Sequence, residues 1–484
     1  MSYKTPGVYV KEVSIFPPSV AEVETAVPAF IGYTEKAEKN GEQLKNVPTK
    51  VTSLLEYTTF FGGGYEVSSV DVQVDEGNNY AVSSVSVDTR FYMYEALRTF
   101  FDNGGGPCYI VSVGFYSGGT VEMGDETDPA NNPGLRVGLH KLKDYDEPTI
   151  ILFPDAPLLA SVNSLFSLQK LALAQCNRLQ DRVAVLDLPE DDGWSDGIEA
   201  FRNNIGINNL KYGAAYTPWL RTTYARDINF EIFKDNVSDS GDNPLNLALL
   251  TSDSALNDLV KTANTSVADV GTIQTTVDGL LGGFPTIEDH YKEQKNAYLD
   301  TEADPEFNAL LDFLRSVAVS LPGWASSLKG KNLLNDLGSY ADQVLKEAVH
   351  ALIGFEKNPA IQAISGKSDG DTDNDYTDYE LPLPWLAEYD SDDDDQVLDD
   401  ITSDGEDYSS ITDAAIPAMQ GIFDSIASFM QQIEDAASTH AENARKILYQ
   451  DHSIIGNIVN NIKKELSKVP PSGALAGVYA KVDN

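Results

Sequence analysis

The acidic stretch 369–380 holds the residues whose types and spacing best suit a chemical role. Its oxygen-bearing side chains stand at positions 1, 3, 5, 7, 9 and 12 of a twelve-residue loop, which is the ligand spacing of an EF-hand. Asn374 stands where glycine is usual, and Pro382 and Pro384 disfavour a following helix. A Ca²⁺ site and a solvated acidic loop both remain open. The candidate metal ligands are Asp369, Asp371, Asp373, Asp375 and Glu380.

The sequence lacks the other common catalytic patterns. Its 5 histidines are scattered without a His-Glu-x-x-His pair, and no serine is flanked as in hydrolase nucleophile motifs. The glycines at 104–106 precede Pro107 and a strand-like stretch, which predicts a turn rather than a phosphate loop. We therefore expect no enzyme activity and no cofactor beyond the candidate Ca²⁺.

Composition narrows the class of protein further. The chain has 484 residues, with 34 Lys and Arg against 75 Asp and Glu, and a net charge of −41 disfavours nucleic acid as a partner. Cys108 and Cys176 are too few for a disulfide framework or a zinc cluster. The sequence has no stretch apolar enough to span a bilayer and no signal-peptide pattern at 1–6, so we expect no membrane insertion.

Strand-like and helix-like stretches alternate through the first 220 residues. This alternation predicts an α/β fold with a parallel sheet and right-handed crossovers. A near-alternating stretch at 65–90 predicts a hairpin. The predicted strands are 29–34, 108–113, 149–154, 182–187 and 212–216, and the predicted helices are 53–61, 91–101, 159–179 and 197–204.

The composition changes near residue 221. Asn, Asp, Ser and Gly become frequent between 225 and 410, with helical stretches near 255–262, 305–318 and 338–354. Apolar residues then recur at helical spacing, which predicts one or two amphipathic helices within 411–468.

The N-terminal residues 1–30 read as an extended segment. Val8, Tyr9, Val10 and Val13 form a β-prone piece flanked by prolines, which suits an arm that adds a strand to another sheet. An ordinary edge strand on the chain's own domain is the other interpretation.

Residues 471–480 mark a boundary between structural elements in the C-terminal part of the chain. Pro470 and Pro471 end the preceding helical pattern, so we expect a turn there. Gly473 and Gly477 allow a conformation or a close approach that a Cβ would prevent.

Several separate stretches, in the same order, resemble contractile tail sheath proteins of phage tails and related bacterial injection systems. The C-terminal one carries the family motif residues Pro471, Ser472, Gly473 and Gly477. The matching stretches are 6–10, 29–32, 100–105, 108–111, 181–187, 215–220 and 470–483.

The resemblance implies an α/β parallel-sheet sheath core with an extended N-terminal arm and a large mixed α+β inserted domain. Residues 1–30 would be the arm, 31–221 the conserved core, and 222–450 an acidic insertion facing outward. Residues 451–484 would hold a helix and the start of a conserved C-terminal domain, which continues further in family members.

The function that the resemblance implies is mechanical. Subunits would assemble as stacked hexameric rings around an inner tube and contract to drive the tube through a target cell envelope. The expected partners are further copies of the chain, the inner tube protein, and baseplate and cap or terminator proteins. Assembly would occur in the bacterial cytoplasm, before the subunit joins a phage tail or a released or envelope-anchored particle. The alternative is a sheath-like surface adhesin or decoration protein with 222–450 as its binding module.

Overall fold

A computed structural model describes residues 26–190, 195–301, 304–329, 352 and 415–483. The predicted arm residues Val8, Tyr9, Val10 and Val13 and the candidate Ca²⁺ loop at 369–380 lie outside these ranges, as does nearly all of the predicted helix 338–354. The chain divides into two compact units. The sheet unit comprises the described residues up to Gln73, Ser83–Ile228, and those from Asn460 onward; the helical unit comprises Val74–Val82 and Asn229–Val459.

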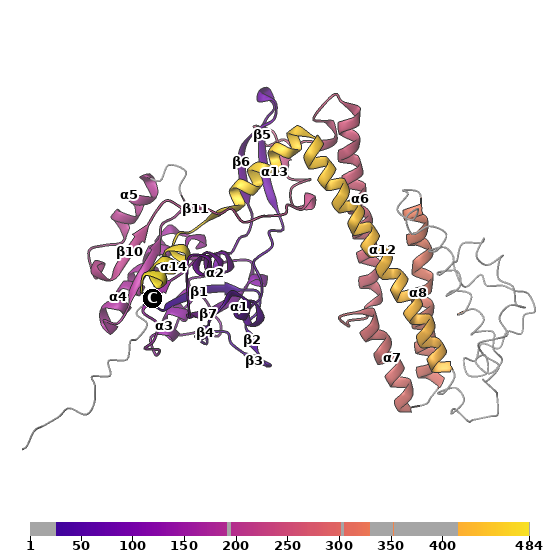
Figure 1. The fold of residues 1–484 in the computed structure, drawn as a ribbon, viewed down its shortest axis with the longest axis horizontal. Helices are drawn as coiled ribbons and strands as arrows, with labels where there is room; N and C mark the ends of the chain where they lie inside the picture. The colour runs from indigo at the N-terminus through magenta and orange to yellow at the C-terminus, as the bar shows by residue number, and fades with distance from the viewer. Residues whose placement is uncertain (1–25, 191–194, 302–303, 330–351, 353–414, 484) are drawn as a thin grey trace, which may run out of the picture. The chain divides into compact units, whose positions relative to one another are not determined.

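A 6-stranded sheet forms the centre of the sheet unit, in the order β10-β9-β8-β1-β7-β4 (Figure 1). Neighbouring strands from β10 to β7 run parallel, and β4 is antiparallel to β7. The mixed α/β architecture with a parallel sheet is therefore confirmed. The strands are β1 (Pro28–Thr34), β4 (Thr49–Val51), β7 (Cys108–Phe115), β8 (Ile150–Leu152), β9 (Val183–Asp187) and β10 (Gly213–Tyr216).

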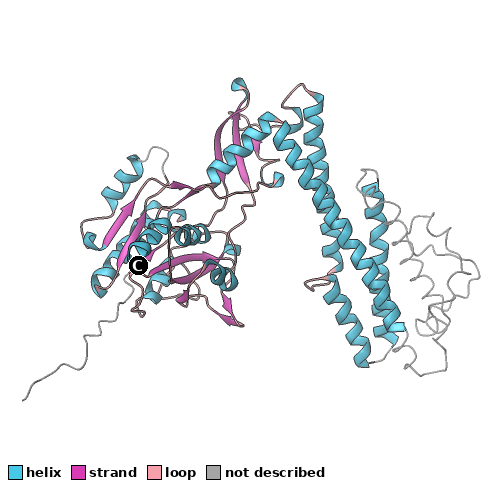
Figure 2. Ribbon diagram, viewed as in Figure 1, coloured by secondary structure: helices cyan, strands magenta, loops and turns pink. Residues whose placement is uncertain are grey.

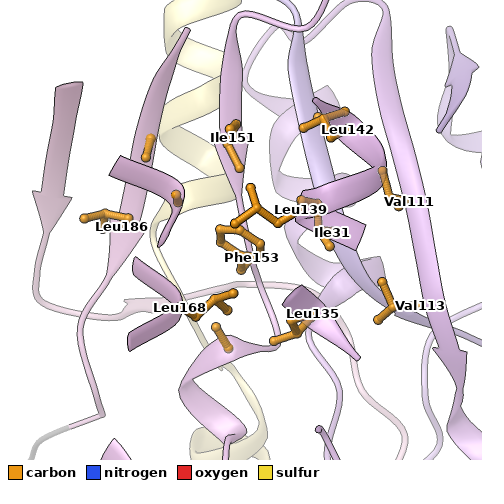
Figure 3. Packing of buried hydrophobic residues seen from close by; sticks show 14 of the residues in the cluster. Ile31, Val111, Val113, Leu135, Leu139, Leu142, Ile151, Phe153, Leu168 and Leu186 are labelled. Atoms are coloured by element: carbon orange, nitrogen blue, oxygen red, sulfur yellow. The ribbon is translucent and has the colours of Figure 1, made fainter. Parts of the chain in front are cut away.

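Helices cover both faces of this sheet, so its central strands β1 and β8 are buried throughout and mostly apolar. Alternate residues of β1 point to opposite faces: Ile31 packs with α3 and α4, whereas Phe30 packs with α1, α2 and α14. Figure 3 shows the first of these clusters, with Phe153 among leucines of α3 and α4. The helices are α1 (Leu54–Phe61), α2 (Met93–Asp102), α3 (Leu135–Leu142), α4 (Val162–Leu179), α5 (Ser195–Asn204) and α14 (Ser472–Asp483).

Local signals place the ends of these helices. The Ser53 hydroxyl accepts a hydrogen bond from the Glu56 N–H at the start of α1, and Ser161 does the same for Asn163 in α4. Gly62 follows α1 with φ 87°, a left-handed value that favours glycine.

Shorter strands complete the described β structure. The predicted hairpin forms from β5 (Val70–Asp75) and β6 (Ala81–Val87), and β12 (Val237–Ser238) joins it beside β5. A second small ladder pairs β11 (Leu220–Arg221) with β13 (Lys468–Val469), and a third pairs β2 (Glu38–Lys39) with β3 (Glu42–Gln43).

The helical unit is built from long helices, drawn in cyan in Figure 2. An apolar stripe on α12, including Phe423 and Ile433, packs against α6, α7 and α8. The helices are α6 (Ser254–Leu280), α7 (Ile287–Thr301), α8 (Asp304–Lys329) and α12 (Ile416–Asp451), and α13 (Ser453–Leu466) continues the chain.

Three helical segments differ from the sequence predictions. α3 and α7 were not predicted, because polar residues interrupt the apolar spacing of both. Residues 471–480 were expected to form a turn and small packed residues, yet α14 begins at Ser472. The prolines end one element and start the next, since proline is tolerated in the first turn of a helix.

Candidate functional site

The predicted motif residues lie where the chain re-enters the sheet unit. β13 pairs with β11 in antiparallel fashion, so Lys468 and Val469 lie opposite Arg221 and Leu220. Pro470 and Pro471 follow, and α14 then packs against α2 and against β8 and β9 (Figure 1). Residues from 460 onward therefore belong to the same compact unit as the sheet.

Gly473 and Gly477 bring the backbones of α14 and α2 into direct contact. A Cβ built on Gly473 would lie 2.4 Å from the Ala96 carbonyl oxygen, and one on Gly477 would lie 2.4 Å from that of Phe100. The two glycines stand one helical turn apart and face the same partner helix. Small residues at this spacing allow close helix packing, so both positions require glycine for space rather than for backbone conformation.

Asp187 fixes the beginning of α14. Its carboxylate Oδ1 accepts a hydrogen bond of 2.9 Å from the Ser472 N–H, and both residues are buried. An anion at a helix N-terminus is favoured by the unpaired N–H groups and by the helix dipole. Burial nevertheless raises the pKa of Asp187 to about 7, against the opposing hydrogen bonding from Ser472.

Arg90 binds the end of α13 and the start of β13, where the chain returns to the sheet unit. Its guanidinium donates hydrogen bonds of 2.6 Å to the Leu466 and Lys468 carbonyl oxygens and one of 3.2 Å to that of Glu465. These carbonyls end α13 and begin β13, where a cation is favourable. Neither Arg90 nor Asp187 was singled out from the sequence, because their partners lie 375 and 285 residues away.

The stretch 215–220 contacts the C-terminal stretch 470–483 within the sheet unit. The hydroxyls of Tyr216 and Tyr479 contact each other, and burial raises the pKa of Tyr479 to about 12. Trp219 donates its indole N–H to the Leu188 carbonyl oxygen at 3.0 Å. Two stretches that the resemblance singled out, 215–220 and 470–483, are therefore in contact in the folded chain.

The sheet ends in two edge strands with different character. β4 carries Lys50, whose ammonium pairs with Glu147, and a charged residue on an edge discourages further strand pairing. β10 pairs with β9 on one side, and in the described residues no strand pairs with its other side. Its sequence, Gly-Ala-Ala-Tyr, contains no charge and no proline.

The structure brings no metal ligands together in the part that it describes. No group of three or more His, Cys, Asp or Glu residues there is placed to hold a metal ion. Asp369, Asp371, Asp373, Asp375 and Glu380 lie outside the described residues. None of the described helices is long and apolar enough to cross a membrane.

Comparison with known proteins gave structural likenesses only. No family model matches the chain, and no curated protein is similar to it. The chain is similar to the helical sheath of the anti-feeding prophage (AFP) in its contracted state, with 21% identity and a TM-score of 0.27. That match covers 46% of this chain and about half (48%) of the sheath chain.

Proposed function

We propose that this protein is a structural subunit of a contractile sheath. It assembles as stacked hexameric rings around an inner tube and contracts to drive the tube through a target envelope. One observation supports this most: the described sheath-like stretches between 29 and 220 and the stretch 470–483 lie in one compact unit. A sheath core interrupted by an insertion at 222–450 requires such a return.

The proposed mechanism needs strong links between subunits that tolerate large rotations. Strand addition provides them, because main-chain hydrogen bonds tie an extended arm to a sheet edge. The predicted arm 1–30 is too long at its end, because Pro28–Phe30 belong to the buried strand β1 of the chain's own sheet. Residues 1–25 would be the donated arm, with Val8, Tyr9, Val10 and Val13 as its pairing positions. Among the described strands, the uncharged outer edge of β10 is the acceptor that we propose.

The remaining parts of the proposal follow from this mechanical role. Contraction would draw its work from new subunit contacts, so the chain would need no enzyme activity and no cofactor. Its partners would be other copies, the inner tube, baseplate and cap or terminator proteins. It would assemble in the bacterial cytoplasm and then form part of a phage tail or a released or envelope-anchored particle.

Electron microscopy of the purified full chain, stained or in ice, tests the proposal. We expect striated tubes or six-fold rings, whereas stable monomers that bind glycans or cells would favour the adhesin alternative.

Val10→Pro removes one backbone N–H from the arm and should abolish tubes, because proline cannot donate to a ladder. Val10→Thr keeps a β-branched residue and serves as the matched control.

The acceptor edge is tested separately. Ala215 is exposed on β10, and Ala215→Lys should prevent assembly by placing a charge on this edge. Ala160→Lys adds the same charge at another exposed alanine and should leave assembly intact. Normal tubes from Ala215→Lys would exclude β10 as acceptor and leave the sheath proposal standing.

Binding of Ca²⁺ at 369–380 is also a proposal. Calorimetric titration of the full chain should show heat that Glu380→Gln removes, because this variant loses the bidentate carboxylate. The absence of heat at millimolar Ca²⁺ would leave a solvated acidic loop.

A further inference from the structure

A cavity of about 690 Å³ lies at the carboxyl ends of β1 and β7. After β1 the chain passes to α1 and α2 on one face of the sheet, and after β7 it passes to α3 on the other face. Ligands of open α/β sheets bind outside the carboxyl ends of the strands, and this cavity lies at such ends. The volume lies within the usual range of small-molecule sites.

Tyr33 at the end of β1 provides a buried donor in this cavity. Its side chain is 5% exposed, and its phenol oxygen accepts a hydrogen bond of 2.9 Å from the Glu122 N–H. Burial raises the pKa of Tyr33, so the hydroxyl stays protonated at neutral pH. Because its oxygen already accepts, its hydrogen is left for a bound molecule.

The loop after β7 forms a fixed wall with acceptor oxygens. Within this loop, the segment 125–132 is closed by the Asp125 N–H to Asn132 carbonyl hydrogen bond of 2.9 Å. The side-chain amides of Asn131 and Asn132 both donate to the Asp128 carboxylate at 3.0–3.2 Å. Both asparagines line the cavity, and an amide whose nitrogen donates elsewhere keeps its oxygen as an acceptor.

The charges of the lining argue against several ligand classes. Lys45 is the cation of this lining, whereas Glu122 and Asp125 are anions, so a phosphate-rich ligand would be repelled. The hydrogen bonds from Thr127 lower the pKa of Asp125, which keeps that carboxylate charged. A long apolar ligand is equally unsuited, because most of these side chains are polar.

We propose that this cavity binds a saccharide of one or two rings. Each sugar hydroxyl both donates and accepts, which matches a lining with one phenol, one ammonium, carboxylates and amide oxygens. The apolar C–H face of a sugar ring can pack on an aromatic ring, and Phe115 lines the cavity with the Lys45 ammonium 5.6 Å from its ring centroid. The proposal is independent of sheath assembly, since the cavity is built within one chain.

The test measures saturation-transfer NMR signals of maltose, lactose and chitobiose with the full chain. We expect at least one disaccharide to bind with Kd of about 1 mM, as is reasonable for an open polar site. Gly118 lines the cavity, and a Cβ there meets no atom within 4 Å, so Gly118→Trp can place a bulky ring at the cavity wall without a backbone clash. This variant should lose the signal.

Gly106→Trp is the matched control, because a Cβ at Gly106 also meets no atom within 4 Å and Gly106 does not line the cavity. It should bind like the unchanged chain. Tyr33→Phe keeps the ring but removes both the proposed hydrogen bond to the ligand and the acceptor of the Glu122 N–H, so affinity should fall at least about tenfold. Absence of binding by all three disaccharides, or equal binding by Gly118→Trp, would overturn the proposal.

Discussion

The two units of this protein use opposite kinds of helix contact. In the sheet unit, Gly473 and Gly477 let the backbone of α14 touch that of α2. In the helical unit, large side chains fill the space: Phe423 of α12 stacks on Tyr291 of α7 with ring centroids 4.0 Å apart. A contact between backbones has no room for one additional methyl group, whereas a contact between rings fails when a ring is removed. The two units should therefore respond oppositely to substitutions that change volume.

The largest expected effect is the loss of the aromatic stack. Phe423→Ala should destabilise the helical unit by about 4 kcal/mol, because the ring is 2% exposed and leaves a cavity. Phe423→Leu, which keeps most of the volume, should cost about 1.5 kcal/mol. Thermal unfolding followed by circular dichroism measures both. A similar loss from the two variants would show that volume does not control this contact.

Adding a methyl group at the other contact should come next. Gly473→Ala should destabilise the sheet unit by about 3 kcal/mol, because its Cβ meets the backbone of Ala96. Gly421→Ala in α12 is the matched control, since its Cβ meets no atom within 4 Å and should instead stabilise by about 0.5–1 kcal/mol. The same sign of change in both variants, measured by denaturant unfolding, would contradict the comparison.

Separating the units should have a smaller effect. The Thr222 N–H donates to the Ser467 carbonyl oxygen at 2.9 Å, so an Asn-Gly turn can replace 223–466 and close a hairpin of β11 and β13. The sheet unit should still fold, with a loss of about 2 kcal/mol. Arg90 loses two of its carbonyl acceptors, those of Glu465 and Leu466, and keeps that of Lys468. A turn of two prolines serves as the control that cannot close the hairpin. Insoluble product from the Asn-Gly chain would show that the units depend on each other.

The last expected effect is a slope, the change of stability with pH, rather than a loss at one pH. The pKa of Asp187 is raised to about 7 in the folded chain, above the usual aspartate value of about 3.9. The folded state therefore holds the extra proton between about pH 4 and 7, and stability falls as pH rises through this window. Asp187→Asn should flatten this fall by at most about 1.4 kcal/mol per pH unit. Urea unfolding at several pH values measures the slope of stability against pH. The control is Asp146→Asn at an exposed aspartate, which should leave this slope unchanged. If Asp187→Asn also leaves it unchanged, the raised pKa is wrongly assigned to Asp187.

The sequence predicted every strand of the six-stranded sheet except the short edge strand β4, but it did not predict the contacts that join α14 and β13 to the sheet unit. Continuous apolar runs such as 149–154 identified buried strands, because parallel strands are covered on both faces. The helix α3 was not predicted, since Gly138 and His140 interrupt its apolar pattern, yet Gly138 lies directly against Ile31 and Val113. The roles of Asp187 and Arg90, which bind the backbone where the chain returns to the sheet unit, were not predicted. Their partners are brought close by tertiary structure rather than by local spacing.

The β11–β13 ladder also has a mechanical consequence. The strands are antiparallel, so the chain leaves the ladder toward 228 and toward 460 from the same end, at the Arg221–Lys468 pair. A force that pulls 228 and 460 apart would therefore open this pair first and the Leu220–Val469 pair second. A ladder loaded in this way unzips at lower force than one whose bonds are sheared together. Arg90 spans the carbonyls on both sides of Ser467 and would have to release them as the ladder opens. The small ladder would therefore yield before the six-stranded sheet, and so protect that sheet from load.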